Sequence, residues 1–408
     1  MLSQFSVKNF KSIKDEITLD MQATSISESS DHLLKTEGGN YLPVSVIYGP
    51  NGAGKSNVLD ALRVLVNKVL RPVIITDSQN NSQMKSLTVQ PFSFSQTTIE
   101  EPTEFEVMFI TDVAEYKYSL SILKDKVVYE RLDRVKFSTK RMSALFERNG
   151  NEIIKKGELS KLKVSEDISD TLPLLSYLGI TYLNNEVVKD VFNWFKNKIR
   201  FLNYGDFLLE YMIWRNRAEG DLKDLIKKMI EELDLDIVDY SFEDKGEHDF
   251  DILTEHDVDG YKAKLHLYDE SKGTQKLFSL LPHIADSLLN GVTLVIDEMD
   301  AKIHPLIIKY IIQRYTDKMI NQSNAQLIFT SHDLSNMNSE VFRRDEIWFV
   351  AKGNYQDTQL YSLVEFKNSK GESVRKDAKY DKQYLEGKYG ADPYLRRIID
   401  WSEYNEKK

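Results

Sequence analysis

The sequence predicts an α/β fold organised around a parallel sheet, and two observations carry that prediction. Three apolar runs, at residues 44–48, 292–296 and 325–329, each end in glycine or polar residues. Buried parallel strands have this near-continuous apolar character, and their polar ends mark one edge of the sheet. The first run is followed by apolar residues at helical spacing: Val58, Leu59, Leu62, Leu65, Val66 and Val69.

Composition narrows the class of protein. The chain has 408 residues, of which 41% are hydrophobic and 29% charged, as is ordinary for a globular protein. It contains no cysteine, which excludes disulfides, cysteine-ligated zinc and thiol nucleophiles. No apolar run approaches the ~20 residues that span a bilayer, and the N-terminus lacks the layout of a secretory signal. We therefore expect a cytoplasmic protein with no membrane partner.

The segment between the first run and its helix fits the pattern G-x-x-x-x-G-K-[ST] over residues 49–56. Glycines let the backbone close around phosphates, while free N–H groups and the helix dipole attract them. Lys55 is expected to reach the β- and γ-phosphates, and the Ser56 hydroxyl to bind Mg²⁺. An ordinary glycine-rich turn is the alternative, which the flanking strand and helix disfavour. The predicted nucleotide-binding residues here are Asn51, Gly52, Gly54, Lys55, Ser56 and Asn57.

The second apolar run ends in Asp297 and Glu298, a Walker B arrangement. At the sheet edge that carries the phosphate loop, Asp297 can support Mg²⁺ and Glu298 can accept a proton from an attacking water. Acidic pairs also occur as helix caps, but the phosphate loop favours the catalytic interpretation. The third run ends at residues 330–333, where His332 either contacts the γ-phosphate or is a surface histidine.

Residues 270–275 precede an apolar helical pattern that contains Leu277, Leu280 and Leu281. Serine and glycine before a helix make a second anion-binding end. One chain with one nucleotide hardly needs two such ends. A head-to-tail dimer does need them, because each subunit can present its second end to its partner's γ-phosphate.

The remaining segments predict local structure. Alternation over residues 5–21 predicts two strands joined by a turn, and residues 24–40 predict a loop. Residues 71–86 suggest an exposed or mobile connection, and residues 87–155 short antiparallel strands with a hairpin turn at 149–151. The period becomes helical over 165–236, with one apolar stripe from Leu222 to Leu233. It returns to alternation over 237–268.

Several motifs, taken together and in order, resemble the ABC-type ATPase heads of the RecF, SMC and OLD group. Within it, the chain is similar to the AAA-family ATPases of bacterial anti-phage and abortive-infection systems, of the RloA and AbiL type. The resemblance is carried by residues 9–12 (Asn-Phe-Lys-Ser), 49–56, 271–274 (Ser-Lys-Gly-Thr), 297–300 with 304–305, 330–332 and the closing stretch 384–393.

The resemblance implies a P-loop ABC-ATPase-like head with an inserted antiparallel β lobe and a helical subdomain. It suggests four parts: an N-terminal ATPase lobe with Walker A (1–86), a β-rich lobe (87–160), a helical insertion (161–236) and a C-terminal ATPase lobe (237–408). The last part would contain the signature motif, Walker B and the histidine switch.

The resemblance also implies roles for individual residues and the cofactors ATP and Mg²⁺. Ser271 and Gly273 would act on the partner's nucleotide, Asp300 would lie at the dimer seam, and His332 would sense the γ-phosphate. Residues 271–274 depart from the transporter-type Ser-Gly-Gly-Gln. For the metal-coordinating glutamine of these families, Gln90 is the best candidate, although it equally suits a structural strand position.

The implied activity is ATP hydrolysis in a sensor that dimerises head-to-tail around ATP, or forms a higher homo-oligomer, and controls a separate nuclease or toxin from a neighbouring gene. Two alternatives stay open: a DNA-repair ATPase that clamps DNA, and an assembly scaffold with very slow turnover. A net charge of −10 does not indicate nucleic acid as a partner. The basic clusters at 136–141, 155–163 and 196–200 suit solvated faces, and His248, His256 and His266 suit surface positions.

Overall fold

The computed structural model describes residues 1–77, 89–165, 168–202, 221–233, 235–246, 249–367 and 371–391. Its central six-stranded sheet has the order β11-β15-β16-β5-β17-β18. The first five strands run parallel and β18 is antiparallel to β17. The bounds are β11 Ile199–Leu202, β15 Thr293–Ile296, β16 Gln326–Thr330, β5 Val44–Tyr48, β17 Ile347–Lys352 and β18 Thr358–Ser362. The predicted α/β class is confirmed.

The central strands are buried on both faces, which explains their unbroken apolar sequences. Every residue of β5, β15 and β16 is buried. Successive side chains enter two different cores, because side chains alternate across a strand. Ile47 packs in the core between this sheet and the seven-stranded antiparallel sheet described below. Its neighbours Val46 and Tyr48 pack in the core on the opposite face.

A seven-stranded antiparallel sheet lies beside the parallel one, in the order β10-β9-β8-β7-β6-β1-β2. Its strands are β1 Leu2–Lys8, β2 Ile17–Asp20, β6 Thr103–Ile110, β7 Ala114–Leu123, β8 Lys126–Lys136, β9 Met142–Asn149 and β10 Glu152–Lys155. The predicted hairpin at 149–151 is confirmed, since Glu152 pairs with Asn149. Because β6 pairs with β1, this sheet extends across the predicted boundary at residue 87.

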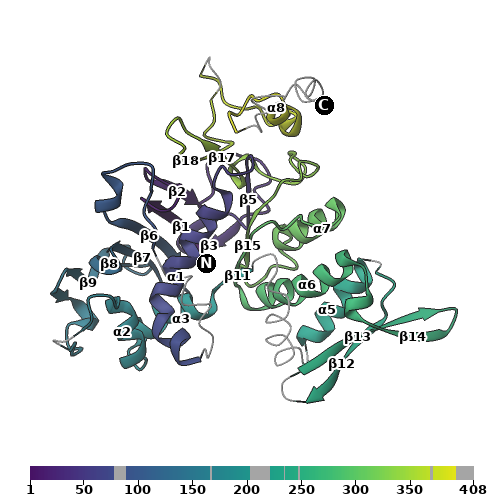
Figure 1. Ribbon diagram of the computed structural model, residues 1–408, viewed down its shortest axis with the longest axis horizontal. Coiled ribbons are helices and arrows are strands. Elements are labelled where there is room, and N and C mark those ends of the chain that lie inside the picture. Colours follow the sequence, from purple (N-terminus) through teal and green to yellow (C-terminus); the bar gives the residue numbers. More distant parts are fainter. Residues whose placement is uncertain are drawn as a thin grey trace, which may run out of the picture.

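Helix α1 (Lys55–Asp77) packs in the core between the two large sheets (Figure 1). Its apolar stripe is buried, as the helical spacing predicts: Val58, Leu59, Leu62, Leu65, Val66 and Val69. Helices α2 (Leu174–Thr181) and α3 (Glu186–Asn197) complete this core. In α3, the Trp194 ring stacks on Phe109 of the antiparallel sheet with 4.2 Å between ring centroids.

Helices α6 (Lys272–Asn290) and α7 (Pro305–Thr316) cover the other face of the parallel sheet, and α5 (Asp221–Glu232) packs on α6 (Figure 1). A three-stranded sheet of β12 (Asp239–Gly246), β13 (Asp249–Val258) and β14 (Tyr261–His266) projects beside them. Helix α8 (Tyr380–Leu385) lies near the last described residues.

Four local expectations are wrong. Ile199–Leu202 is strand β11 inside the segment predicted as helical, because four residues are too few for periodicity to separate strand from helix. The predicted loop over 24–40 contains most of a short hairpin, β3 (Leu34–Thr36) and β4 (Gly39–Tyr41). Helix α1 continues to Asp77, into the predicted connection, whose residues 78–86 lie outside the described part.

The fourth concerns His256, whereas the His266 side chain is 36% exposed, in keeping with its predicted surface position. His256 is mostly buried and its Nε2 lies 2.7 Å from Glu270, while His266 Nδ1 lies 3.0 Å from Asp251. Their partners are distant in the sequence, which left no local signal. His248 lies outside the described residues.

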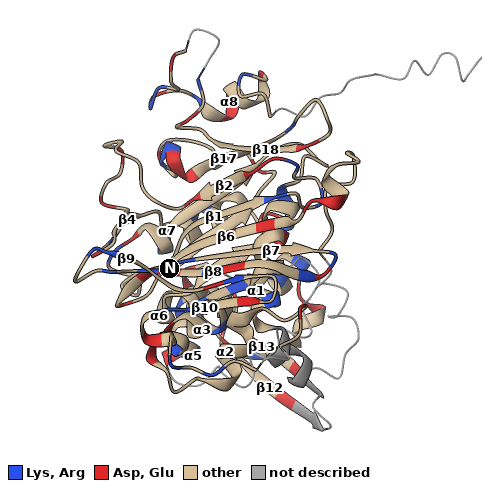
Figure 2. Ribbon diagram, turned by 90° about the vertical axis from the view of Figure 1, so that its left-hand side faces the viewer, with Lys and Arg blue, Asp and Glu red and all other residues tan. Residues whose placement is uncertain are grey.

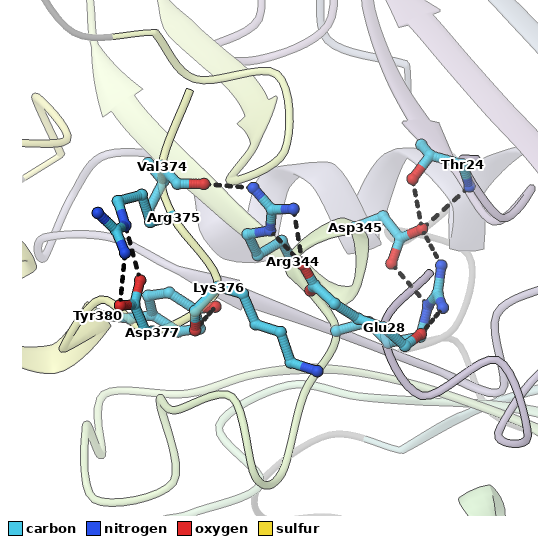
Figure 3. Close-up of polar contacts among 10 residues, drawn as sticks. Thr24, Glu28, Arg344, Asp345, Val374, Arg375, Lys376, Asp377 and Tyr380 are labelled. Carbon is cyan, nitrogen blue, oxygen red and sulfur yellow. Dashed lines mark hydrogen bonds and ion pairs between the residues drawn. The ribbon is translucent and has the colours of Figure 1, made fainter. Parts of the chain in front are cut away.

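A buried ionic network joins the N-terminal loops to the start of β17 (Figure 3). The Arg343 guanidinium donates to both oxygens of Asp345 at 2.9 and 2.7 Å, and both side chains are almost fully buried. Thr24 donates its N–H and hydroxyl to the same carboxylate at 3.0 and 2.7 Å. Next to this pair, Arg344 bonds Glu28 and the carbonyl of Val374. Segments far apart in the sequence are thereby held together.

Within the described ranges, no helix has both the length and the apolar content to cross a membrane.

Replacement of Asp345 by asparagine is expected to lower the free energy of unfolding by about 3–5 kcal/mol, because it leaves the buried Arg343 cation without its counter-charge. Urea denaturation followed by circular dichroism measures this change. The matched control is Asp377→Asn, which breaks the exposed Arg375–Asp377 pair of the same sequence spacing and should leave the midpoint unchanged. Equal midpoints for the two variants would contradict the assigned role of the network.

Candidate functional site

The site lies where the carboxyl ends of β15, β16 and β5 meet. The pairing is in register: Ile296 lies opposite Phe329, and Thr330 lies opposite Ile47. The residues that follow each strand must therefore share one edge of the sheet. These are the phosphate-loop pattern after β5, the acidic pair after β15 and the 331–333 turn after β16.

The loop at 49–56 needs glycine for steric reasons. Gly52 and Gly54 have φ angles of +74° and +106°, in the region that side chains rarely adopt. A Cβ on Gly54 would stand 2.2 Å from Thr358 Oγ1 and 2.8 Å from Ser12 Oγ. Thr358 in turn donates to the Ala53 carbonyl at 2.8 Å and lies 2.7 Å from the Ser12 hydroxyl. The loop is thus braced from outside by two hydroxyl side chains that sequence reasoning did not single out for this role.

Lys55 begins α1 and is only 7% exposed. Its Nζ donates to the carbonyls of Gly49, at 2.8 Å, and Pro50, at 3.3 Å, so the ammonium lies inside the curve of the loop. Burial lowers the pKa of Lys55, and the negative charges of Asp297, Glu298 and Asp300 oppose that shift. A buried cation at the start of a helix is suited to hold the phosphates of a nucleotide.

The other loop residues divide into two groups. Asn51, Gly52 and Ser56 are exposed and available to a ligand. Asn57 donates from Nδ2 to Ser12 Oγ at 2.7 Å, so in this arrangement it supports the brace of the loop.

Ser56 and Asp297 line one small pocket, as the predicted metal site requires. A hydroxyl and a carboxylate are hard oxygen donors of the kind that Mg²⁺ prefers when nucleotide phosphates supply other ligands. In the part of the chain that the structure describes, no group of three or more His, Cys, Asp or Glu side chains could hold a metal by itself. The residues present therefore fit a metal that arrives with its nucleotide.

Thr330 joins the acidic pair to the end of β16. Its hydroxyl donates to Asp297 Oδ1 at 2.6 Å and accepts the Glu298 N–H at 2.7 Å. Thr330 has no role predicted from the sequence beyond its place in the 330–332 motif. A hydroxyl residue at the end of an apolar strand is the one signal that was available.

Glu298 has an exposed side chain on a constrained backbone. Its φ is +51°, a left-handed conformation that costs a non-glycine residue about 1–2 kcal/mol. Such strain persists where surrounding contacts over-determine it. Thr330 supplies one of these contacts, and Lys276 of α6 supplies another by donating to the Glu298 carbonyl at 3.0 Å.

Asp300 organises the turn that contains His332. Its Oδ2 accepts the N–H groups of His332 and Asp333, both at 2.9 Å. Its Oδ1 is buried and accepts no hydrogen bond from the described residues. The His332 side chain is exposed at this edge.

The second predicted anion-binding end is the N-terminus of α6. Ser271 caps the helix, accepting the Thr274 N–H at 3.1 Å, and its side chain is exposed. Gly273 is the second residue of α6, and a Cβ at this position would lie 3.2 Å from the Lys302 carbonyl oxygen. The α6 end therefore packs against the turn that follows the acidic pair.

Gln90 is exposed, and its carbonyl accepts the Lys11 N–H at 2.8 Å. Lys11 precedes Ser12, whose hydroxyl accepts from Asn57 next to the loop. Gln90 is thus on the segment that borders the loop, and its role as a metal ligand stays a prediction.

Comparison with known proteins gives one family match and several distant structural likenesses. A family model described as "AAA domain, putative AbiEii toxin, Type IV TA system" matches residues 44–338. No curated protein matches the chain.

Among solved structures, the chain is similar to an SMC head domain from Thermotoga maritima, with 14% identity over 88% of this chain and 98% of that chain, at a TM-score of 0.43. It is also similar to an Smc head domain with a coiled coil and joint derived from Pyrococcus yayanosii, with 11% identity over 94% and 99% of the two chains, at a TM-score of 0.42.

Replacement of Lys55 by methionine is expected to lower affinity for magnesium–nucleotide triphosphates by about 100-fold or more, because it removes a buried charge-assisted donor. The free energy of unfolding should stay within about 1 kcal/mol, since the folded state already disfavours the charged lysine, as its lowered pKa shows. Fluorescent-nucleotide titration and urea denaturation measure the two quantities. Lys35→Met, at an exposed position on β3, is the control. A variant that binds as tightly as the wild type would contradict the assignment.

Proposed function

Since the chain belongs to the AAA-domain family described as a putative AbiEii toxin of a type IV TA system, we propose that it is the ATP-binding and ATP-hydrolysing switch of a bacterial abortive-infection defence against phage. The observation that carries the enzymatic part is the meeting of Lys55, Asp297 and Glu298 at one sheet edge. In this proposal the chain controls a separate toxin or nuclease.

The chain's own residues supply binding and orientation. The glycine-rich loop and Lys55 hold the triphosphate, while Ser56 and Asp297 hold Mg²⁺, whose charge stabilises the transferring phosphoryl group when it is bound. Thr330 occupies Oδ1 of Asp297 and thereby fixes the orientation of this carboxylate.

Hydrolysis requires a base for the attacking water. Glu298 is exposed beside Asp297, on a backbone held by Thr330 and Lys276, and it suits this task. His332 lies on the turn that Asp300 holds, where its side chain can contact the γ-phosphate.

We propose that two subunits pair head-to-tail around ATP and that higher homo-oligomers build on this pair. The exposed cap at Ser271 and Gly273 then faces the partner's γ-phosphate, a contact that exists only with ATP bound and so makes assembly depend on the nucleotide. Asp300 suits the dimer seam in this arrangement, because it lies in the turn against which the Gly273 end of α6 packs.

Replacement of Glu298 by glutamine is expected to reduce ATP turnover by about 100- to 10,000-fold, the usual contribution of a general base. Nucleotide affinity should persist, so the ATP-bound dimer should accumulate. Steady-state phosphate release and light scattering after size-exclusion chromatography measure turnover and mass. Glu152→Gln, on the exposed edge strand β10, is the matched control. Turnover and mass indistinguishable from the wild type would overturn the switch.

DNA binding separates this proposal from a repair clamp. The 136–141 and 155–163 clusters lie beside an acidic residue: Lys136 pairs with Glu158 at 3.0 Å, and Glu158 also pairs with the neighbouring Arg134 at 2.8 Å. Figure 2 shows acidic and basic residues interspersed over the face that it draws. We therefore expect no ATP-dependent, salt-sensitive retention of DNA in filter binding. Such retention would favour the clamp.

A further inference from the structure

Lys276 is a buried lysine in the first turns of α6 and lies outside every motif that the nucleotide site uses. We propose that Lys276 is a positioning residue that holds the backbone of Glu298 in its catalytic geometry and links it to the N-terminal end of α6. The inference rests on the proposed function in one respect, since it takes Glu298 as the base.

Lys276 is 4% exposed, and its Nζ donates to two carbonyls of one backbone turn: Ala301 at 2.7 Å and Glu298 at 3.0 Å. The Ala301 N–H also bonds the Glu298 carbonyl, at 3.2 Å. One ammonium therefore closes the turn that carries the acidic residues. Burying a lysine is unfavourable unless its N–H donors are satisfied. The two carbonyls satisfy this ammonium, and in return it stabilises the turn that carries them.

The charges around Lys276 also suit this position. Burial lowers its pKa to about 8, Asp300 and Glu298 oppose the shift, and Lys302 adds to it. The amine therefore faces the acidic side of the site.

The turn that Lys276 holds is strained. Glu298 and Lys302 have φ angles of +51° and +63°, so the backbone passes through the left-handed region at both ends of the turn. Thr330 fixes the Glu298 N–H from the β16 side, and Lys276 fixes its carbonyl from the α6 side. Loss of either contact frees this peptide to relax.

The same helix begins at the exposed Ser271 cap, and Gly273 packs against the Lys302 carbonyl. The α6 end therefore contacts the turn at two places, through the backbone at Gly273 and through the Lys276 side chain. A shift of α6 that follows from contact with a partner's nucleotide would reach Glu298 of its own subunit by this route.

The test is Lys276→Met, which keeps the length and apolar stem of the side chain and removes the donor. We expect kcat for ATP to fall about 10- to 100-fold, the effect of a small misplacement of a catalytic group, while KM and nucleotide affinity change less than about 3-fold. Hydrogen–deuterium exchange of the 297–302 turn should increase. Lys68→Met removes a similarly buried lysine on α1 that pairs with Asp125 away from the site, and it should leave kcat, KM, nucleotide affinity and exchange of the 297–302 turn unchanged.

If Lys276→Met does not fold, Lys276→Arg supplies the measurement. It keeps a buried cation but replaces the compact ammonium with a larger planar guanidinium, so the two carbonyls must shift to bond it and kcat should fall with KM retained. A folded Lys276 variant with wild-type kcat, or one in which kcat and KM change by similar factors, overturns the inference. A wild-type protein without turnover overturns the proposed function instead. Even without turnover, the inference can be tested by hydrogen–deuterium exchange. If exchange of the 297–302 turn is the same in the Lys276 variant as in the wild type, the inference is wrong.

Discussion

The parallel pairing of β16 with β15 on one side and β5 on the other is the constraint on which the site depends. Register fixes what happens at the strand ends: Thr330 finishes opposite Ile47 and within hydrogen-bonding distance of Asp297. A slip of one residue would turn the hydroxyl to the other face and separate the acidic pair from the phosphate loop. The buried faces of all three strands prevent such a slip, because each face belongs to a different apolar core.

The sequence predicted those parts of the site that are local in the chain. The loop, the acidic pair and the α6 cap each span only a few consecutive residues, whose types alone mark them as motifs. The structure brings the first two to one edge of the sheet. The supporting residues were not predictable in this way. Ser12 and Thr358 meet across 346 positions of the chain, and the two carbonyls that Lys276 binds lie 22 and 25 residues away. Nothing in either sequence neighbourhood marks these contacts, which the packing of separate elements creates.

Two lysines are buried at this edge, and burial lowers the pKa of each. Lys55 and Lys276 both place their ammonium groups against backbone carbonyls, and nearby carboxylates partly offset the cost of burial. A core built for stability alone would place apolar side chains there. The site therefore trades stability for charges in fixed positions, and it also accepts left-handed backbone at Glu298. Strain and buried charge gathered at one place are typical of a functional site.

The two accessory sheets each reach the nucleotide site by a short path. At the turn after β1, which belongs to the antiparallel sheet, the Ser12 hydroxyl braces the phosphate loop through Thr358. In the three-stranded sheet, Thr254 and His256 of β13 both bond the Glu270 carboxylate, at 2.6 and 2.7 Å, and Glu270 directly precedes the α6 cap. Each sheet thus bonds a residue adjacent to an anion-binding end. Ser12 bonds Asn57, which follows the phosphate loop, and β13 bonds Glu270, which precedes the α6 cap. Both anion-binding ends are therefore anchored by side chains from outside the parallel sheet, which adds to the strand register in holding them in place.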